Sequence, residues 1–183
     1  PSGCDSLGAR DVWAWRVGDT TYMHYDGAGA QGWLACLAVS TDPAIWIPRG
    51  PILSFGSPGS KDSASASYGV TFQERDRWHL FYVGTPNTSP PPDRIPAFPY
   101  LTMKGEGRSP AGPWKKRYDI VPFVPRPGTY YSACASPGQI IRHKDGYLMF
   151  FSASTDAPIL RTLGGSQRVL VDSMAESRGR EES

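Results

Sequence analysis

The sequence has few cysteines and no long apolar run, and each shortage excludes a class of protein. Its three cysteines, Cys4, Cys36 and Cys134, lie far apart without a C-x-x-C pair, so they indicate neither a disulfide framework nor a zinc site. Cys36 lies in an apolar run, which predicts a buried thiol that packs as a small hydrophobic side chain. No run approaches the ~20 apolar residues of a membrane-spanning helix, so no membrane partner is expected.

The chain also lacks an excess of charge of one sign. Nineteen basic and 17 acidic residues are spread along 183 positions, giving a net charge of +2 and no basic patch for nucleic acid. The three histidines have no metal-ligand spacing, and we expect no metal or cofactor. The start at Pro1 lacks an initiator Met and the order of a signal peptide, which is typical of a processed, trimmed or fragmentary chain. If a signal peptide has been removed, a secreted or periplasmic location is favoured.

Turn-forming and aromatic residues are abundant instead. Twenty glycines and 18 prolines make up about a fifth of the chain, between the usual share of roughly 12% and the roughly 25–30% of unpatterned disorder. Six Trp, nine Tyr and seven Phe supply far more apolar ring surface than a solvated, disordered chain would carry. The chain should therefore fold, with many turns.

A polar turn followed by an aromatic-rich strand occurs three times. These segments are Gly18–Tyr25, Arg75–Tyr82 and Lys144–Phe151. Each is preceded by a short strand-like stretch, at Asp11–Val17, Tyr68–Gln73 and Gln139–His143. Aromatic strands that flank a short polar turn are a hairpin signal, so three β-hairpins are predicted.

The first two units also share a closing element that ends in tryptophan. Ser40–Trp46 resembles Ser109–Trp114, and the spacing between the two tryptophans is close to the spacing between Asp76 and Asp145 in the second and third hairpin turns. A period of roughly 60–70 residues with about four strands per unit is typical of radial sheet repetition, and it predicts a β-propeller. A β-sandwich is the alternative, but it gives no reason for the equal spacing. The repeated tryptophans are predicted to pack between blades rather than to bind ligand.

These motifs resemble the five-bladed propeller glycoside hydrolases, the superfamily that contains families 43, 32, 68, 117 and 130. The matching segments are Asp11–Trp13, Ala38–Asp42 through Trp46, Leu80–Tyr82 and Ala111–Trp114. The resemblance implies an all-β fold. Because five such units need roughly 300 residues, only about two and a half to three blades are expected. Residues 1–164 form the partial propeller in this prediction, and residues 165–183 form a polar tail that is disordered or helical.

The resemblance also implies catalytic carboxylates at the inner strands of successive blades. Asp11 matches the general base, with a capping role or a pairing with Arg10 as the alternative. Asp62 is proposed as the second carboxylate, which orients substrate or tunes the acid; the alternative is a solvated residue beside Lys61. Ser136-Pro137-Gly138 stands where family 43 has Glu-Gly-Pro, so the acid is Asp93, Glu106 or a residue on missing blades.

An insertion at Gly84–Tyr100 holds six prolines in seventeen residues, interleaved with apolar side chains, and predicts a stiff, ordered loop. If the loop rims the funnel, Asp93 and Arg94 contact substrate hydroxyls. Aromatic rings can stack on sugar faces. The rings predicted as sugar-binding walls, with simple packing as the alternative for each, are Trp13, Trp33, Tyr130 and Tyr131.

The predicted function is that of a glycoside hydrolase acting on a polysaccharide or oligosaccharide by carboxylate acid and base catalysis. The expected partner is carbohydrate. Two alternatives remain open: a non-catalytic sugar-binding propeller, and a glycoside phosphorylase, which needs a cationic pocket for phosphate. Because the ring cannot close, little catalytic activity is expected of the chain. An incomplete ring also leaves sheet edges unpaired, so the chain is expected to self-associate.

Overall fold

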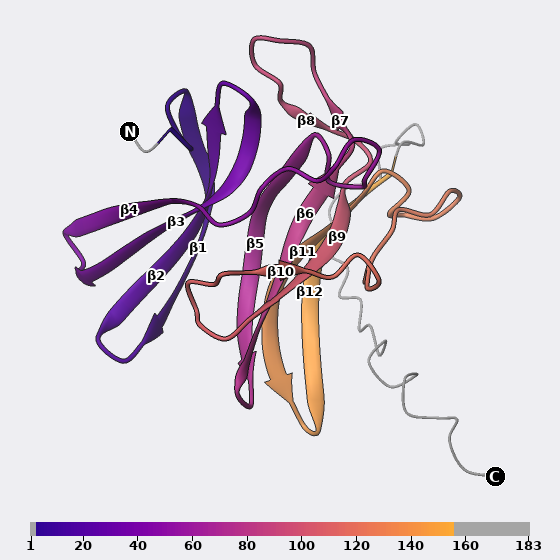
Figure 1. The fold of residues 1–183 in the computed structure, drawn as a ribbon. Helices are drawn as coiled ribbons and strands as arrows, with labels where there is room; N and C mark the ends of the chain where they lie inside the picture. The colour runs from indigo at the N-terminus through magenta and orange to yellow at the C-terminus, as the bar shows by residue number, and fades with distance from the viewer. Residues whose placement is uncertain (1–2, 156–183) are drawn as a thin grey trace, which may run out of the picture.

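The computed structural model describes residues 3–155, and they form strands, turns and loops (Figure 1). The strands are β1 (Gly8–Val17), β2 (Thr20–Gly29), β3 (Gly32–Asp42), β4 (Ile45–Pro51), β5 (Ser65–Glu74), β6 (Arg77–Thr85), β7 (Asn87–Thr88), β8 (Pro96–Ala97), β9 (Leu101–Gly107), β10 (Lys115–Lys116), β11 (Cys134–His143) and β12 (Gly146–Ser154). Within this range no helix could cross a membrane. Residues 156–164, the end of the predicted partial propeller, and the predicted tail lie outside the described residues.

The three predicted hairpins are present as the antiparallel pairs β1–β2, β5–β6 and β11–β12. Each has a two-residue turn whose first residue, Gly18, Arg75 or Lys144, has a positive φ of 50–58°. A positive φ at that position gives the turn the twist of the flanking strands, which explains why the polar turns end the strands where they do. The first strand of each hairpin starts earlier than predicted; β11, for example, begins at Cys134.

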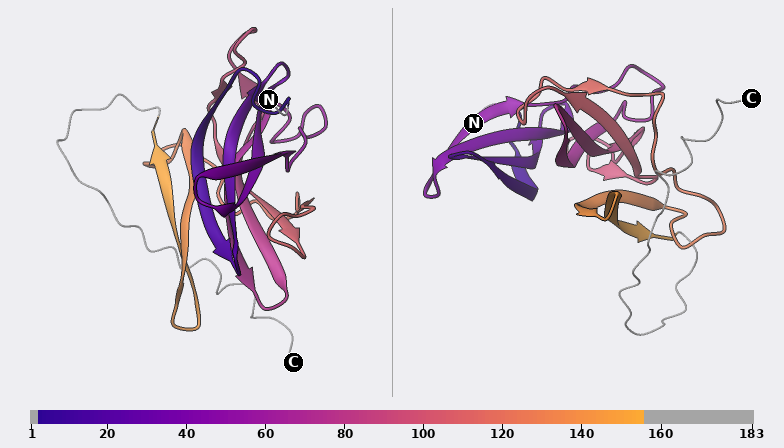
Figure 2. Two further views of the ribbon diagram at one scale, coloured as in Figure 1. Left: turned by 90° about the vertical axis from the view of Figure 1, so that its left-hand side faces the viewer. Right: turned by 90° about the horizontal axis from the view of Figure 1, so that it is seen from below.

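The hairpins belong to three successive blades, which Figure 2 shows one after another when the molecule is seen from below. The first blade contains β1 to β4, and the second contains β5, β6, β9 and β10. One parallel bridge, between Leu34 and Ala66, joins these two blades. The third blade has β11 and β12 in the described part of the chain. This is the radial arrangement of a propeller, and the ring does not close within residues 3–155.

A core of aromatic side chains packs the first blade against the second. The Trp15 ring lies 6.5 Å from the Trp78 ring, and the His24 ring lies between Trp15 at 4.6 Å and Trp114 at 6.2 Å. Burial lowers the pKa of His24 to about 3, although a backbone contact with Gly69 acts in the opposite direction, so the imidazole is neutral. The prediction that tryptophans pack between blades is confirmed for Trp15, Trp78 and Trp114.

Trp46 differs from its repeat partner. It lies on β4, at the outer edge of the first blade, and is 36% exposed, whereas Trp114 is buried between the two blades. The repeat therefore conserves the position of the tryptophan in the blade, but burial depends on which blade packs against it.

The prediction for the cysteines was wrong in one respect, because Cys4 and Cys36 form a disulfide. Cys36 is fully buried, as expected, but the segment before β1 folds across β2 and brings Cys4 to it. Gly27 permits this crossing, because a Cβ there would collide with the Cys4 carbonyl and the Cys36 sulfur. Because Cys4 and Cys36 are 32 residues apart, no local sequence pattern indicated that they come together.

The third blade packs against the second through backbone pairing and aromatic contacts. The backbone of Tyr100 pairs with that of Ala133 and Ala135, and Thr102 Oγ1 donates to the Ala135 carbonyl at 2.7 Å. The rings of Phe72 and Tyr147 lie 4.7 Å apart. These contacts hold β11 near β5, so the first strands of all three blades converge.

Candidate functional site

A cavity of about 530 Å³ lies where the first strands of the three blades, β1, β5 and β11, come together. The loop after β8 forms part of its wall, through Phe98 and Tyr100. Among the described residues that line it, the carboxylates are Asp11 and Asp26 and the cation is Arg10. A larger, open hollow of about 680 Å³ lies between β2 to β4 and the loop before β10, but its described lining includes no carboxylate, so the inner cavity is the candidate site.

Asp11 lies on a β-bulge in β1. Arg10 pairs with Asp26 and Val12 pairs with Tyr25, which leaves Asp11 as the extra residue, with a φ of 48°. A bulge interrupts the ladder and redirects one side chain, and bulges are common beside active sites. The Asp11 side chain is 60% exposed and lines the cavity, so it is accessible to water and to a ligand.

Asp26, on β2, is the second carboxylate that lines the cavity, and it is buried, with 2% exposure. The backbone N–H of Tyr68 donates a hydrogen bond to its carboxylate, and Arg10 Nε lies 3.7 Å from its Oδ2. Burial raises the pKa of Asp26 to about 7; the Tyr68 N–H and Arg10 oppose this rise, and the charge of Asp11 adds to it. Asp26 therefore holds a proton up to about neutral pH.

Arg10 is shared by both carboxylates. Its Nε lies 3.5 Å from Asp11 Oδ2, and its guanidinium carbon stands 4.2 Å from the centre of the Trp33 ring. Trp33 in turn donates from Nε1 to the Asp93 carbonyl at 3.4 Å. One face of the Trp33 ring, predicted as a sugar-binding wall, is thus occupied by Arg10, and Asp93 contributes its backbone rather than its carboxylate. Trp33 positions the arginine that separates the two acids.

Asp62 lies elsewhere, in the loop before β5. It is fully buried and accepts hydrogen bonds from Lys116 at 2.6 Å, Tyr82 at 2.8 Å and Ser60 at 3.0 Å. It is not among the residues that line the cavity, so it has no contact with a ligand there. The alternative of a solvated residue also does not hold. Asp62 is thus the centre of a buried polar cluster, and its catalytic role stays a prediction.

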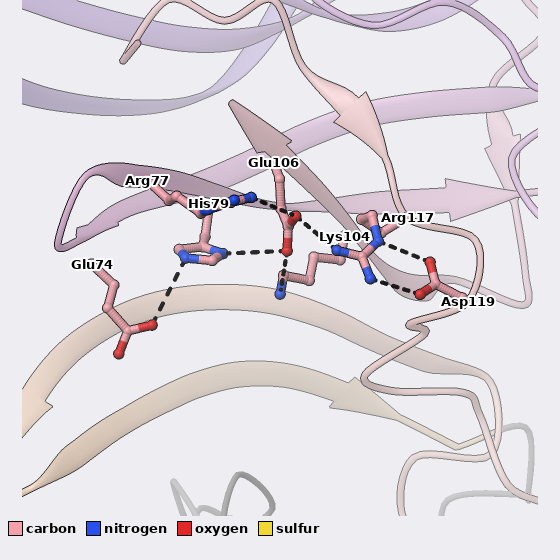
Figure 3. A network of polar contacts seen from close by, with 7 residues as sticks. All are labelled: Glu74, Arg77, His79, Lys104, Glu106, Arg117 and Asp119. Carbon is pink, nitrogen blue, oxygen red and sulfur yellow. Dashed lines mark hydrogen bonds and ion pairs between the residues drawn. The ribbon is translucent and has the colours of Figure 1, made fainter. Parts of the chain in front are cut away.

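The other predicted site residues do not line the cavity. These residues are Trp13, Trp33, Asp93, Arg94, Tyr130, Tyr131 and Glu106. Tyr130 and Tyr131 pack against each other with ring centres 5.0 Å apart in the loop before β11. Glu106, one of the candidate acids, is surrounded by cations on the outer strands of the second blade (Figure 3).

Asp26 was missed by the sequence reasoning, although a signal for it exists. Counting back from a two-residue turn at Gly18-Asp19 pairs Asp11 opposite Asp26, and the bulge then shifts this register by one residue. The predicted hairpin therefore already implied two neighbouring carboxylates. Ser136, Pro137 and Gly138 line the cavity, so the segment that lacks a glutamate does reach the site.

The fold is that of known sugar-active enzymes. The sequence matches no protein-family model and no curated protein. Its structure resembles a glycoside hydrolase (TM-score 0.62, 16% identity, 78% of this chain and 47% of that one). It also resembles a thermostable family-43 glycoside hydrolase (0.54, 16%, 84% and 52%) and a beta-1,2-mannobiose phosphorylase from Listeria innocua (0.59, 17%, 84% and 39%). The chain thus has a propeller fold like that of the family-43 enzymes, and spans about half their length or less.

Proposed function

We propose that this chain carries the active site of a glycoside hydrolase, with Asp11 and Asp26 as its carboxyl pair. The observation that supports the proposal is the pairing of an exposed carboxylate with a buried one whose pKa is about 7, in the cavity where three blades converge. Cleavage of a glycosidic bond usually needs two carboxyl groups, one protonated and one ionised. Different environments that separate two pKa values identify such a pair.

In this proposal the two groups have different roles. Asp11, at the open bulge, is the base or nucleophile that acts at the anomeric carbon, either by taking a proton from water or by direct attack. Asp26 holds the proton that the leaving oxygen requires. Arg10 lies between them and keeps the charges of the two carboxylates apart. Asp26 takes the acid's role because Ser136-Pro137-Gly138 brings no carboxylate to the cavity.

A phosphorylase is the second candidate, because one structural neighbour is a phosphorylase. Likeness of fold does not decide between the two reactions. A phosphorylase needs cations for phosphate, and Arg10 is the cation among the described lining residues, already engaged by two carboxylates. The charge of the cavity thus favours hydrolysis.

The test is turnover of aryl arabinosides, xylosides and fructosides by the full chain. Asp11→Asn is expected to lower kcat/KM by roughly 10²–10⁴-fold, the usual contribution of a positioned acid or base. Asp145→Asn, in the exposed turn between β11 and β12, is the matched control and should leave turnover unchanged. Turnover that requires added inorganic phosphate would instead identify a phosphorylase. Glycan binding without turnover would identify a sugar-binding propeller.

A further inference from the structure

Phe98 is a large apolar side chain left exposed in the wall of the cavity. It is 53% exposed, although it lies in a concave site beside Asp11 and Asp26. Its ring packs edge to face on Tyr100, with centres 4.7 Å apart, and Tyr100 also lines the cavity. An exposed aromatic surface inside a cavity that also contains polar groups is a feature of ligand-binding sites.

The backbone around Phe98 is held in place by three side chains. Asn87 Nδ2 donates to the Phe98 carbonyl at 2.8 Å, and Thr85 Oγ1 donates to the Ala97 carbonyl at 2.6 Å. The Tyr100 hydroxyl donates to the Pro96 carbonyl at 2.6 Å. The exposed ring is therefore presented by an ordered loop, and little conformational entropy is lost when a ligand binds to it.

The same loop is joined to the carboxyl pair. The Asp93 carbonyl accepts from Trp33, and Trp33 stacks on Arg10, which contacts both acids. The loop thus contacts the carboxyl pair indirectly through the Asp93 carbonyl, and it also supplies Phe98 to the cavity wall.

The remaining wall indicates the chemistry of the ligand. Apart from Arg10, Asp11 and Asp26, which pair with one another, the described lining residues are uncharged, and several are serines and tyrosines. Hydroxyl groups and aromatic rings together suit the hydroxyls and the C–H face of a neutral sugar.

We propose that Phe98 and Tyr100 form a subsite platform on which one unit of a neutral oligosaccharide stacks, next to the unit whose bond faces Asp11. The identification of the ligand as a sugar rests on the proposed function. Phe98 provides the stacking face, and Tyr100 supports it from the side.

Calorimetric binding of neutral arabino-, xylo- and fructo-oligosaccharides to the full chain tests the platform in an Asp11→Asn background, which prevents turnover. Phe98→Ala is expected to weaken the affinity of the oligosaccharide that binds by about tenfold, and Phe98→Tyr to keep it within about twofold. Phe150→Ala is the matched control. Phe150 is 45% exposed on β12 and is not among the cavity-lining residues, so its removal should leave affinity unchanged.

The platform would be overturned if Phe98→Ala bound the oligosaccharide as tightly as its parent. Equal losses of affinity in Phe98→Ala and Phe150→Ala would also overturn it, as would the absence of binding of any of these sugars. The two proposals fail separately. Binding that depends on Phe98, with no hydrolysis by the unmutated Asp11 chain, would overturn the hydrolase assignment alone. Hydrolysis that depends on Asp11, with binding indifferent to Phe98, would overturn the platform alone.

Discussion

Two polar clusters in this molecule are both built from cations and carboxylates but differ in charge balance. The cavity cluster consists of Arg10, Asp11 and Asp26, one cation against two carboxylates. The outer cluster, drawn in Figure 3, lies on the second blade and in the segments that flank it, and consists of Glu74, Arg77, His79, Lys104, Glu106, Arg117 and Asp119. In the cavity cluster acids outnumber the cation, whereas in the outer cluster three cations surround one central acid.

Glu106 is that central acid. Its carboxylate lies 2.7 Å from Arg117, 3.0 Å from Lys104 and 3.9 Å from Arg77. Burial would raise the pKa of Glu106, but hydrogen bonds from Lys104 and Arg117 outweigh burial and hold it below its usual range. Glu106 is thus ionised at neutral pH and is a poor proton donor, which argues against the acid role predicted for it.

The difference separates a structural cluster from a chemical one. Matched charges lower the pKa of the acid and stabilise the folded state. The cavity cluster leaves Asp26 buried with its pKa raised to about 7, so its ionised form costs stability, which is typical of a functional site. Substitutions that remove the charge of Glu106 and of Asp26 should therefore change the free energy of unfolding in opposite directions.

The largest expected effect is that of Glu106→Ala, which leaves three cations around an empty position. The free energy of unfolding should fall by about 2 kcal/mol at pH 7, because breaking a partly buried pair strands its partners. Urea unfolding measures this loss. Glu74→Ala is the control, since Glu74 is half exposed and lies 3.9 Å from His79; it should change stability little. An equal loss in both variants would contradict a central role for Glu106.

Asp26→Asn should change the free energy of unfolding in the opposite direction, towards greater stability. Because the folded pKa of Asp26 is about 7 and its usual pKa is 3.8, the folded chain binds more protons than the unfolded chain between these values. Stability conferred by Asp26 is therefore highest below about pH 4 and falls as the pH rises to 7. Asparagine mimics the protonated acid, so the variant should be more stable than its parent by about 1 kcal/mol at pH 8. Urea midpoints from pH 4 to 8 should show a gap that widens with pH. A gap of constant size would contradict the raised pKa.

Local features of the sequence predicted the hairpins and the repeat, whereas Asp11 was placed at an inner strand by the family resemblance. Turn residues and aromatic alternation act over a few residues, so they are readable without tertiary structure. The environments of the acids were not readable in this way. Asp26 is buried by the second blade, through Tyr68, and Asp62 is neutralised by Lys116 from 54 residues away. Both contacts depend on how blades and loops pack, for which the sequence has no local pattern.

Arg10→Gln tests what the one cation of the cavity cluster does. Arg10 lowers the pKa of Asp26, so its removal should raise that pKa further above its usual value. Titration of the Asp26 carboxyl carbon by NMR measures the change, with little expected effect on stability. Arg16→Gln is the control, because Arg16 is 68% exposed and pairs with Asp19 in the first turn. An unchanged titration of Asp26 in Arg10→Gln would show that Arg10 does not contribute to the pKa of Asp26.

The smallest effect is expected at Arg77, the outlying cation of the outer cluster. Its guanidinium is 63% exposed and lies 3.9 Å from Glu106, whereas Arg117 lies at 2.7 Å and also holds Asp119. Glu106 keeps Arg117 and Lys104 when Arg77 is lost, so Arg77→Gln should change the free energy of unfolding by less than about 0.5 kcal/mol. A double-mutant cycle of Arg77→Gln with Glu106→Gln should give a coupling energy smaller than that of Arg117→Gln with the same partner. Equal couplings would mean that total charge, rather than contact geometry, holds the outer cluster together, and the contrast with the cavity cluster would then rest on the number of cations alone.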